Sequence, residues 1–350
     1  MTPTMSNIAT LDDVHYQEYI LQGVSRTFAL TIPQLPSALR EVVGNAYLLC
    51  RIVDTVEDDS ALTLEQTREL AEMFIEVVSG TVEAETFAQS LHPLLSEHTI
   101  PAEHDLIKHT PSVIRMTHSF NPVQRQALER CIRIMGQGMA AYQESESLSG
   151  LENLAEMDRY CYHVAGVVGE MLTELFCNYS PEINQHKPML MQLSVSFGQG
   201  LQMTNILKDI WEDRKRGACW LPRDIFLQEG FDLNDLQPGC FERGFHAGLG
   251  TLIGIAKTHL QNALAYTCLI PSHETGVRRF CLWAIGMAVL TLNKINHKRD
   301  FITGGEVKIS RRSVRATVLV TSLLASQDWA LKRIFAISSR NLPEVQINRS

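Results

Sequence analysis

The chain has 350 residues, 45% of them hydrophobic and 20% charged, and a formal net charge of −8 at pH 7. This length can bury a large core, and no low-complexity linker separates regions of different composition, so we expect one domain over residues 1–350. The negative charge argues against nucleic acid as a partner, because such binding needs a basic face that neutralises phosphates. The eight cysteines show no CxxC pattern, so we expect reduced core residues.

Helical periodicity runs along most of the chain. Apolar residues recur at three- and four-residue spacing near residues 11–30, 36–58, 63–79, 122–146, 151–179, 187–214, 240–269, 274–298 and 312–336. Neither the alternation of strands nor a repeat of fixed period is seen. Segments 160–179 and 190–210 are apolar on more than one face, which is typical of the central helices of a large bundle. The sequence therefore predicts an all-α fold.

The N-terminal residues and the longest apolar run bear on export and membrane insertion. The opening MTPTMSNIATLDD lacks the basic and then apolar run of a secretion signal. The run FCLWAIGMAVLTL, residues 280–292, has 13 residues and is too short to span a bilayer. We therefore expect a cytoplasmic protein with neither a signal peptide nor a transmembrane segment.

A dense acidic group follows an apolar helix at RIVDTVEDDS, residues 51–60. At helical spacing the carboxylates of Asp54, Glu57 and Asp58 project along one side, where they repel one another. A bound cation would remove the repulsion, and Mg²⁺ suits such a site because it takes one or two carboxylates and completes its shell with water and phosphate. The alternative is a solvated helix end with surplus acid.

A second copy of this pattern lies in QMTNILKDIWEDRKRG, residues 202–217. Asp209, Glu212 and Asp213 repeat the spacing, and Asn205 faces the same way one turn earlier. Two such groups, each leaving a buried helix, are expected to face one another across a bundle and hold Mg²⁺, which would stabilise a diphosphate leaving group. Arg51 and Lys208 lie beside the acids and are candidates to meet phosphate oxygens.

Five stretches together resemble the squalene synthases of the squalene and phytoene synthase family. They are SRTFAL (25–30), YLLCRIVDTVEDD (47–59), DRYCYHVAGVVGE (158–170), QGLQMTNILKDIWEDRKRG (199–217) and FCLWAIGMAVLTL (280–292). The resemblance runs from about residue 20 to 320. It implies a single-domain isoprenoid-synthase bundle with a central active-site cavity. It also implies Mg²⁺-dependent joining of two farnesyl diphosphates to presqualene diphosphate, followed by reduction to squalene with NADPH.

The resemblance also implies roles for individual residues. Tyr160 matches the family tyrosine that assists the proton loss closing the cyclopropane, so it joins Asp54, Asp58, Asp209 and Asp213 as a catalytic candidate. An allylic cation survives only where water is excluded, so an apolar pocket is expected. We place Phe28, Tyr47, Gln202 and Phe280 there, although the phenylalanines are equally suited to an ordinary core.

A cofactor site is expected in HKRDFITGGEVKISRRSVR, residues 297–315, and not in GQGMAA, residues 136–141, which lacks a preceding strand. The segment GGEVKISRR resembles the flexible family segment that contacts NADPH, and Lys308 matches its lysine. Ser310 stands where the family usually has arginine, so Arg311 is the candidate replacement. Arg26, Arg51 and Lys208 complete the expected contacts. The alternative is a solvated turn or a patch that touches anionic lipid.

Two other functions stay open at this point. A relative without the reductive step would make dehydrosqualene, phytoene or presqualene diphosphate. A non-catalytic assembly protein of the family would be expected to lose acids from one group, but all six are present. Because the expected product is insoluble in water, we also expect loose contact with a membrane through an exposed apolar patch.

Overall fold

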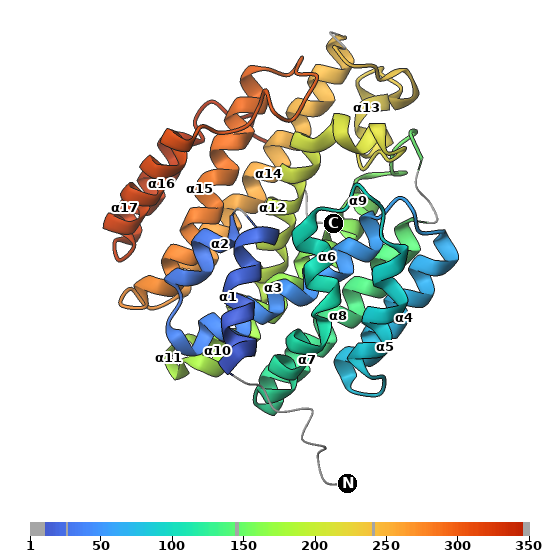
Figure 1. The fold of residues 1–350 in the computed structure, drawn as a ribbon. Coiled ribbons are helices and arrows are strands. Elements are labelled where there is room, and N and C mark those ends of the chain that lie inside the picture. Colours follow the sequence, from blue (N-terminus) through green and yellow to red (C-terminus); the bar gives the residue numbers. More distant parts are fainter. Residues whose placement is uncertain (1–10, 26, 144–146, 240–241, 346–350) are drawn as a thin grey trace. The chain divides into compact units, whose positions relative to one another are not determined.

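The computed structural model describes residues 11–25, 27–143, 147–239 and 242–345. Helices follow one another along these residues, and no β-strand occurs among them (Figure 1). A single isolated bridge joins Leu151 to Pro222. The predicted all-α fold is confirmed. Arg26 lies outside the described residues, so its predicted cofactor contact stays a prediction.

The helices form two compact units. The first comprises Met1–Glu144 and Met171–Gln185, and the second comprises Ser145–Glu170 and His186–Ser350. One of the three chain boundaries between them falls within α10 (Val167–Tyr179). The expectation of one domain over residues 1–350 stays a prediction.

The first unit is built around α3 (Ser37–Asp58), whose residues from Leu39 to Val56 include a continuous buried side. Asn45, on α3, is fully buried; it donates to the carbonyl of Val113 and accepts from the hydroxyl of Thr117. These bonds fasten α3 to α7. The other helices are α1 (Leu11–Val24), α2 (Phe28–Thr31), α4 (Leu64–Ser79), α5 (Ala84–Leu91), α6 (Pro101–Lys108), α7 (Thr110–Ser119), α8 (Pro122–Gln143) and α11 (Pro181–Asn184), with the 3-10 turns η2 (Ile32–Gln34) and η3 (His92–Leu94).

Local sequence signals explain where several of these helices begin and end. Thr63 and Gln66 form a reciprocal capping box at the start of α4. Gly80 ends that helix in the left-handed conformation, with φ of 83°, and its N–H bonds the last carbonyls. Prolines occupy the first turn of α6, α7 and α8, where a missing N–H costs nothing.

The second unit packs around three long helices, α12 (Lys187–Lys215), α14 (Arg243–Leu269) and α15 (Thr275–His297), which contact one another and lie side by side in Figure 1. α16 (Arg311–Leu324) and α17 (Asp328–Ser338) pack beside α15. The remaining elements are α9 (Leu154–Cys161), the π-turn η4 (Tyr162–Gly166), α13 (Arg223–Gln228) and η5 (Leu233–Asp235).

The apolar run at 280–292 belongs to a longer helix than the sequence predicted. α15 has 23 residues and is long and apolar enough to cross a bilayer, so the expectation that this segment is too short was wrong. However, 67% of its most apolar window is buried inside the structure. Its contacts with α12, α14, α16 and α17 are those of a core helix.

Two glycines bring backbones of the second unit into direct contact. A Cβ at Gly169 would lie 2.1 Å from the carbonyl oxygen of Ser194, and one at Gly198 would lie 2.1 Å from that of Ala165. Because no side chain fits there, α12 lies directly against the helical stretch that carries Tyr160. The position of that stretch on α12 is therefore set by backbone contact.

Three details of the helical pattern differ from the sequence prediction. The segment 312–336 forms two helices, α16 and α17, with a turn between them. The stretch 11–30 contains α1 and the separate short helix α2. Helices α5, α6 and α7 were not predicted, because helices of eight to ten residues offer too few turns for a clear periodic pattern.

Replacement of Gly198 by alanine should destabilise the protein. The added methyl would overlap the Ala165 carbonyl, so the two helices must separate, at a cost of about 1–3 kcal/mol in the free energy of unfolding. Gly136→Ala on α8 is the matched control, because its Cβ would sit 3.4 Å from Ile75 and alanine favours a helix. Urea unfolding followed by circular dichroism compares them, and an unchanged midpoint for Gly198→Ala would contradict the close contact.

Candidate functional site

The first acidic group occupies the last turns of α3, as the sequence predicted. Tyr47, Arg51, Asp54 and Asp58 are spaced by four, three and four residues, so they follow one side of the helix. Arg51 Nη1 lies 3.8 Å from the Asp54 carboxylate. Glu57 is partly exposed one residue before Asp58. The structure therefore brings the predicted base and acids of the first unit together.

Arg51 is held in place by several acceptors. Its guanidinium lies 3.5 Å from Glu103 of α6, and Nη2 donates to the carbonyl of Val24 at 3.4 Å. Burial alone would lower the pKa of Arg51, but Asp54, Tyr47 and Glu103 raise it above its ordinary value. The Nε–H is buried and has no partner among the described residues. This unused donor fits an anionic ligand such as phosphate.

The environment of Asp54 opposes its negative charge. Burial raises the pKa of Asp54 to about 7; Arg51 works against this rise, and the nearby carboxylates of Asp58 and Glu103 add to it. The side chain still keeps 31% exposure. A carboxylate that is costly to ionise alone, yet reachable, is suited to a cation.

Asp59 behaves differently from its neighbours. Burial alone would raise the pKa of Asp59, but hydrogen bonds from Thr99, Ala61 and Ser96 outweigh it and lower the pKa. The hydroxyl of Thr99 donates at 2.6 Å and the N–H of Ser96 at 2.8 Å. Asp59 is therefore a structural residue that ties the end of α3 to the segment before α6.

Two predicted pocket residues lie beside this group. The rings of Phe28 and Tyr47 are 5.0 Å apart and tilted by 37°. The Tyr47 hydroxyl donates to the carbonyl of Val24 at 3.0 Å, the same acceptor that Arg51 uses. An aromatic wall therefore adjoins the cationic and acidic side of α3.

The second acidic group lies on the last turns of α12 in the second unit. Gln202, Asn205, Asp209 and Glu212 are spaced by three, four and three residues and follow one side of the helix. Lys208 Nζ lies 3.0 Å from the carboxylate of Asp209. Burial raises the pKa of Asp209, which Lys208 opposes and Glu212 reinforces. The spacing predicted from the sequence is reproduced here.

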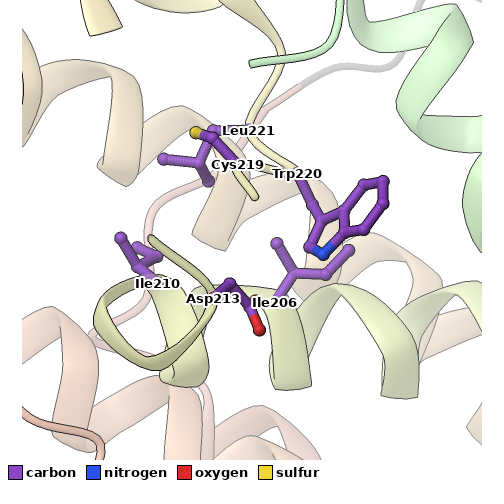
Figure 2. Close-up of a pocket in the computed structure, with 6 residues that line it drawn as sticks. All are labelled: Ile206, Ile210, Asp213, Cys219, Trp220 and Leu221. Atoms are coloured by element: carbon purple, nitrogen blue, oxygen red, sulfur yellow. The ribbon is translucent and has the colours of Figure 1, made fainter. Parts of the chain in front are cut away.

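Asp213 is more enclosed than the other acids. Its side chain is 10% exposed and accepts from Arg216 at 2.7 Å. It also lines a small pocket, together with Ile206, Ile210, Cys219, Trp220 and Leu221 (Figure 2). Asp213 is thus turned toward the segment after α12, and its predicted role at a metal stays a prediction.

Trp220 links this pocket to Tyr160. The two rings are stacked, with centroids 4.1 Å apart and planes 6° from parallel, and both side chains are buried. Tyr160 precedes the π-turn η4, and such turns interrupt helices at functional sites. The sequence did not indicate Trp220, because the stacking depends on contact between residues 60 positions apart.

The glycine-containing loop lies directly on the second acidic group. The N–H of Gly304 donates to Glu212 Oε1 at 3.0 Å, and a Cβ at Gly304 would lie 3.2 Å from Asp209 Oδ1. The indole of Trp211, on the same helix, donates to the carbonyl of Phe301 at 2.5 Å. The loop and the acids are therefore parts of one local structure.

The basic residues of this loop are exposed, except for the half-buried Arg299. Lys308 and Arg311 reach solvent, whereas Lys298 pairs with Glu306 inside the loop. Ser310 caps α16 by accepting the N–H of Ser313 at 3.1 Å. Serine at this position therefore starts a helix, which arginine could not do through a side-chain oxygen.

Of the two remaining predicted pocket residues, Phe280 lies on α15 and is buried among core residues of the second unit. Gln202 is half-buried on α12. Neither position tests contact with a substrate, so both assignments stay predictions.

The acids are of the chemical type that binds Mg²⁺. In the described parts of the chain, however, no group of three or more His, Cys, Asp or Glu side chains is arranged to hold a metal ion. Oxygen donors from Asp, Glu and Asn are those that Mg²⁺ prefers, and it needs few from protein when phosphate and water supply the rest. Glu212 Oε2 is buried and has no hydrogen-bond partner in the described structure, which suits an oxygen that binds a cation. The exposed Lys308 and Arg311 carry the positive charge and N–H donors that suit the phosphates of a dinucleotide.

One polar cluster of the second unit has no counterpart in the sequence analysis. His259 Nδ1 on α14 lies 2.8 Å from Ser196 Oγ on α12, and Asn262 donates to the same oxygen at 2.9 Å. The serine proton is therefore left to donate to a neutral imidazole. Burial lowers the pKa of His259 to about 4, which keeps the ring uncharged near neutral pH.

The family model for squalene/phytoene synthases matches residues 21–313, which run through both units and both acidic groups. The chain belongs to the squalene/phytoene synthase family.

Relatives within the squalene/phytoene synthase family agree with this placement. The squalene synthase of Saccharomyces cerevisiae is 29% identical over 313 residues, covering 87% of this chain and 66% of the relative. That of Schizosaccharomyces pombe is 30% identical over 330 residues, covering 93% and 69%. The chain thus spans about two thirds of the length of these relatives. A solved ligand complex of TcSQS has the same fold, with a TM-score of 0.75 and 24% identity over 96% of this chain and 94% of that one.

Removal of the Glu212 carboxylate should release the glycine loop. Glu212→Ala deletes the acceptor of the Gly304 N–H. Because a hydrogen bond to a charged group stabilises the closed loop, its loss should make the loop open more often, and tryptic cleavage after Lys308 should accelerate roughly tenfold. Mass spectrometry of timed digests measures the rate, with Glu229→Ala, an exposed acid after α13, as the control. Equal rates in Glu212→Ala and the unmodified protein would mean that this contact does not hold the loop.

His259 should make the protein less stable in mild acid. The imidazole of an unfolded chain takes up a proton near pH 6.5, but the folded one does so only near pH 4, so the free energy of unfolding should fall as pH drops from 6.5 toward 4. His259→Gln should lessen that fall, whereas the exposed His15→Gln should not. Denaturant midpoints across this range provide the measurement, and identical slopes in all three proteins would exclude a neutral buried His259.

Proposed function

We propose that this chain is an enzyme that condenses two farnesyl diphosphates head to head into presqualene diphosphate and then reduces that product to squalene with NADPH. Relatives at 29% and 30% identity that carry the name squalene synthase support the proposal. The observation that carries it is the bond between Gly304 and Glu212. It joins the loop expected to bind the reductant to the acids expected to bind the diphosphate.

The acids and their basic neighbours would act on the leaving group. Asp54, Glu57 and Asp58 of the first unit, and Asn205, Asp209, Glu212 and Asp213 of the second, would hold Mg²⁺. Bound Mg²⁺ supplies charge neutralisation to a departing diphosphate. Arg51, through its unpartnered Nε–H, and Lys208, beside Asp209, would donate to phosphate oxygens.

The condensation breaks one C–O bond and forms carbon–carbon bonds, and closing the cyclopropane releases a proton. Tyr160 would accept or relay that proton at its phenol oxygen. Its stacking on Trp220 fixes the ring plane, so the oxygen has a defined direction. Phe28, Tyr47, Gln202 and Phe280 would line the pocket that keeps water from the allylic cation.

The reductive step would use the loop. When bound, NADPH would supply the hydride that reduces the carbocation left by departure of the second diphosphate. Lys308 and Arg311 would bind the cofactor's phosphates, helped by Arg26, Arg51 and Lys208. A related enzyme without reduction is the second candidate, and one observation favours it: Ser310 serves as a helix cap where the family usually has arginine.

Two coarser proposals accompany the reaction. The match over residues 21–313 supports a single isoprenoid-synthase domain that includes both units. A cytoplasmic protein in loose contact with a membrane is also proposed, because squalene is insoluble in water.

A product assay tests the reaction. Purified protein is incubated with farnesyl diphosphate and Mg²⁺, with and without NADPH, and the organic and diphosphate fractions are analysed by mass spectrometry. Squalene should form only when NADPH is present, with presqualene diphosphate in its absence. If NADPH changes nothing, the reductive half is wrong and the second candidate stands; if no coupled product forms, both are wrong.

Substitutions then test the residues. Asp54→Asn and Asp209→Asn should each lower kcat roughly 100-fold or more, because a lost carboxylate weakens charge neutralisation, whereas Asp12→Asn and Asp235→Asn, both exposed, should not. Tyr160→Phe should slow formation of presqualene diphosphate. Circular dichroism confirms folding, and full activity in an acid variant would remove that carboxylate from the mechanism.

A further inference from the structure

The helical hairpin formed by α16 and α17 exposes large apolar side chains. Leu319 and Leu323 of α16 are 61% and 69% exposed, and Trp329 and Ile337 of α17 are 72% and 56% exposed. Leu323 and Trp329 stand on either side of the turn at residues 325–327. Exposed apolar groups gathered on one supersecondary element signal an interaction surface.

The same hairpin is strongly basic in an acidic protein. Residues 311–340 contain six Lys or Arg and one acid, a net charge of +5, which leaves −13 on the rest of the chain. The acid, Asp328, accepts from buried Arg278 at 2.7 Å. The positive charge of the hairpin is therefore not neutralised from within it.

Apolar and basic side chains share the exposed sides of both helices. On α16, Arg315, Leu319 and Leu323 recur every four residues. On α17, Trp329, Arg333 and Ile337 do the same. Residues at this spacing lie along one side of a helix, so each helix presents a mixed apolar and cationic stripe.

Arg278 holds the hairpin in shape. Its guanidinium is nearly fully buried and donates to the carbonyl of Ala325 at 2.8 Å and to that of Ile270 at 2.8 Å, besides its bond to Asp328. These bonds fix the turn between the two helices. Leu323 and Trp329 therefore flank a turn that is fixed by hydrogen bonds and keeps both side chains exposed to solvent.

We propose that the hairpin of α16 and α17 binds the surface of an anionic lipid bilayer, with Leu323 and Trp329 entering the headgroup region and the basic residues contacting lipid phosphates. Leucine and tryptophan beside Lys and Arg are the composition that interfacial helices use. A symmetric pair of chains would bring two surfaces of charge +5 together, and this repulsion disfavours a second copy as the occupant.

This inference deepens the membrane contact proposed above by naming its surface, and it does not depend on the reaction. Of the four tryptophans, Trp211, Trp220 and Trp283 are at most 7% exposed. Fluorescence changes on lipid binding should therefore come from Trp329.

The test uses the full chain with vesicles of phosphatidylcholine, with and without phosphatidylglycerol. We expect sedimentation with the anionic vesicles only, weaker at high salt, and a blue shift of tryptophan emission that brominated lipid quenches. Equal binding to both vesicle types, or binding without quenching, would overturn the proposal. Light scattering without lipid measures the oligomeric state. If the unmodified protein is a dimer and the variant with Leu323→Ser and Trp329→Ser is a monomer, the surface serves self-association and the proposal is overturned.

Paired variants locate the contact. The double variant Leu323→Ser with Trp329→Ser should weaken partitioning into anionic vesicles at least tenfold. The double variant Lys332→Gln with Arg333→Gln should weaken it roughly 30-fold, because each lost charge weakens binding about fivefold. The matched controls are Tyr19→Ser with Leu64→Ser, 70% and 53% exposed, and Lys108→Gln with Arg223→Gln, both exposed. Partitioning unchanged in the hairpin variants, or reduced equally in the controls, would overturn the proposal.

Activity in detergent separates this proposal from the reaction. Product formation should be equal in the unmodified protein and in the variant with Leu323→Ser and Trp329→Ser. An unmodified protein that binds anionic vesicles yet makes no product would contradict the proposed function and still support this surface.

Discussion

Repulsion among carboxylates at the ends of two helices is the constraint on which the site depends. The C-terminal end of a helix already carries partial negative charge, so acids placed there raise the local cost further. Both α3 and α12 end in this way. In the first unit, Arg51 and the raised pKa of Asp54 reduce this repulsion. In the second unit, Lys208, Arg216 and the N–H of Gly304 reduce it. Charge compensation by protein groups is partial in each, which suits an exchangeable cation.

The second unit carries more of the expected chemistry within one local structure. α12 bears the acids, the following segment places Trp220 against Tyr160, and the loop from Phe301 returns to Glu212. Each contact joins residues distant in sequence through a hydrogen bond or stacked rings. A substitution in the loop can therefore alter the acids without touching them.

The long helices and the spacing of the acids could be predicted from the sequence, because both are periodic patterns within single elements. Asp54, Asp58, Asp209 and Glu212 do lie along helix sides as the spacing indicated. Three other features could not be predicted from the sequence, since each depends on packing between distant segments. They are the turn that separates α16 from α17, the stacking of Trp220 and the position of Gly304 on Glu212. Asp59 shows the same limit: it belongs to the acidic run by sequence, but hydrogen bonds from Thr99 and Ser96 give it a structural task.

The backbone contacts at Gly169 and Gly198 bear on how far sequences of this fold can diverge. Two helices that meet through carbonyl oxygens and glycine Cα atoms keep their spacing whatever side chains surround them. Neighbouring positions can then drift, and pocket shape can be retuned, while the tyrosine and the acids keep their places on the scaffold. In this chain the spacing of the two helical segments therefore depends on two glycines rather than on a whole packed layer.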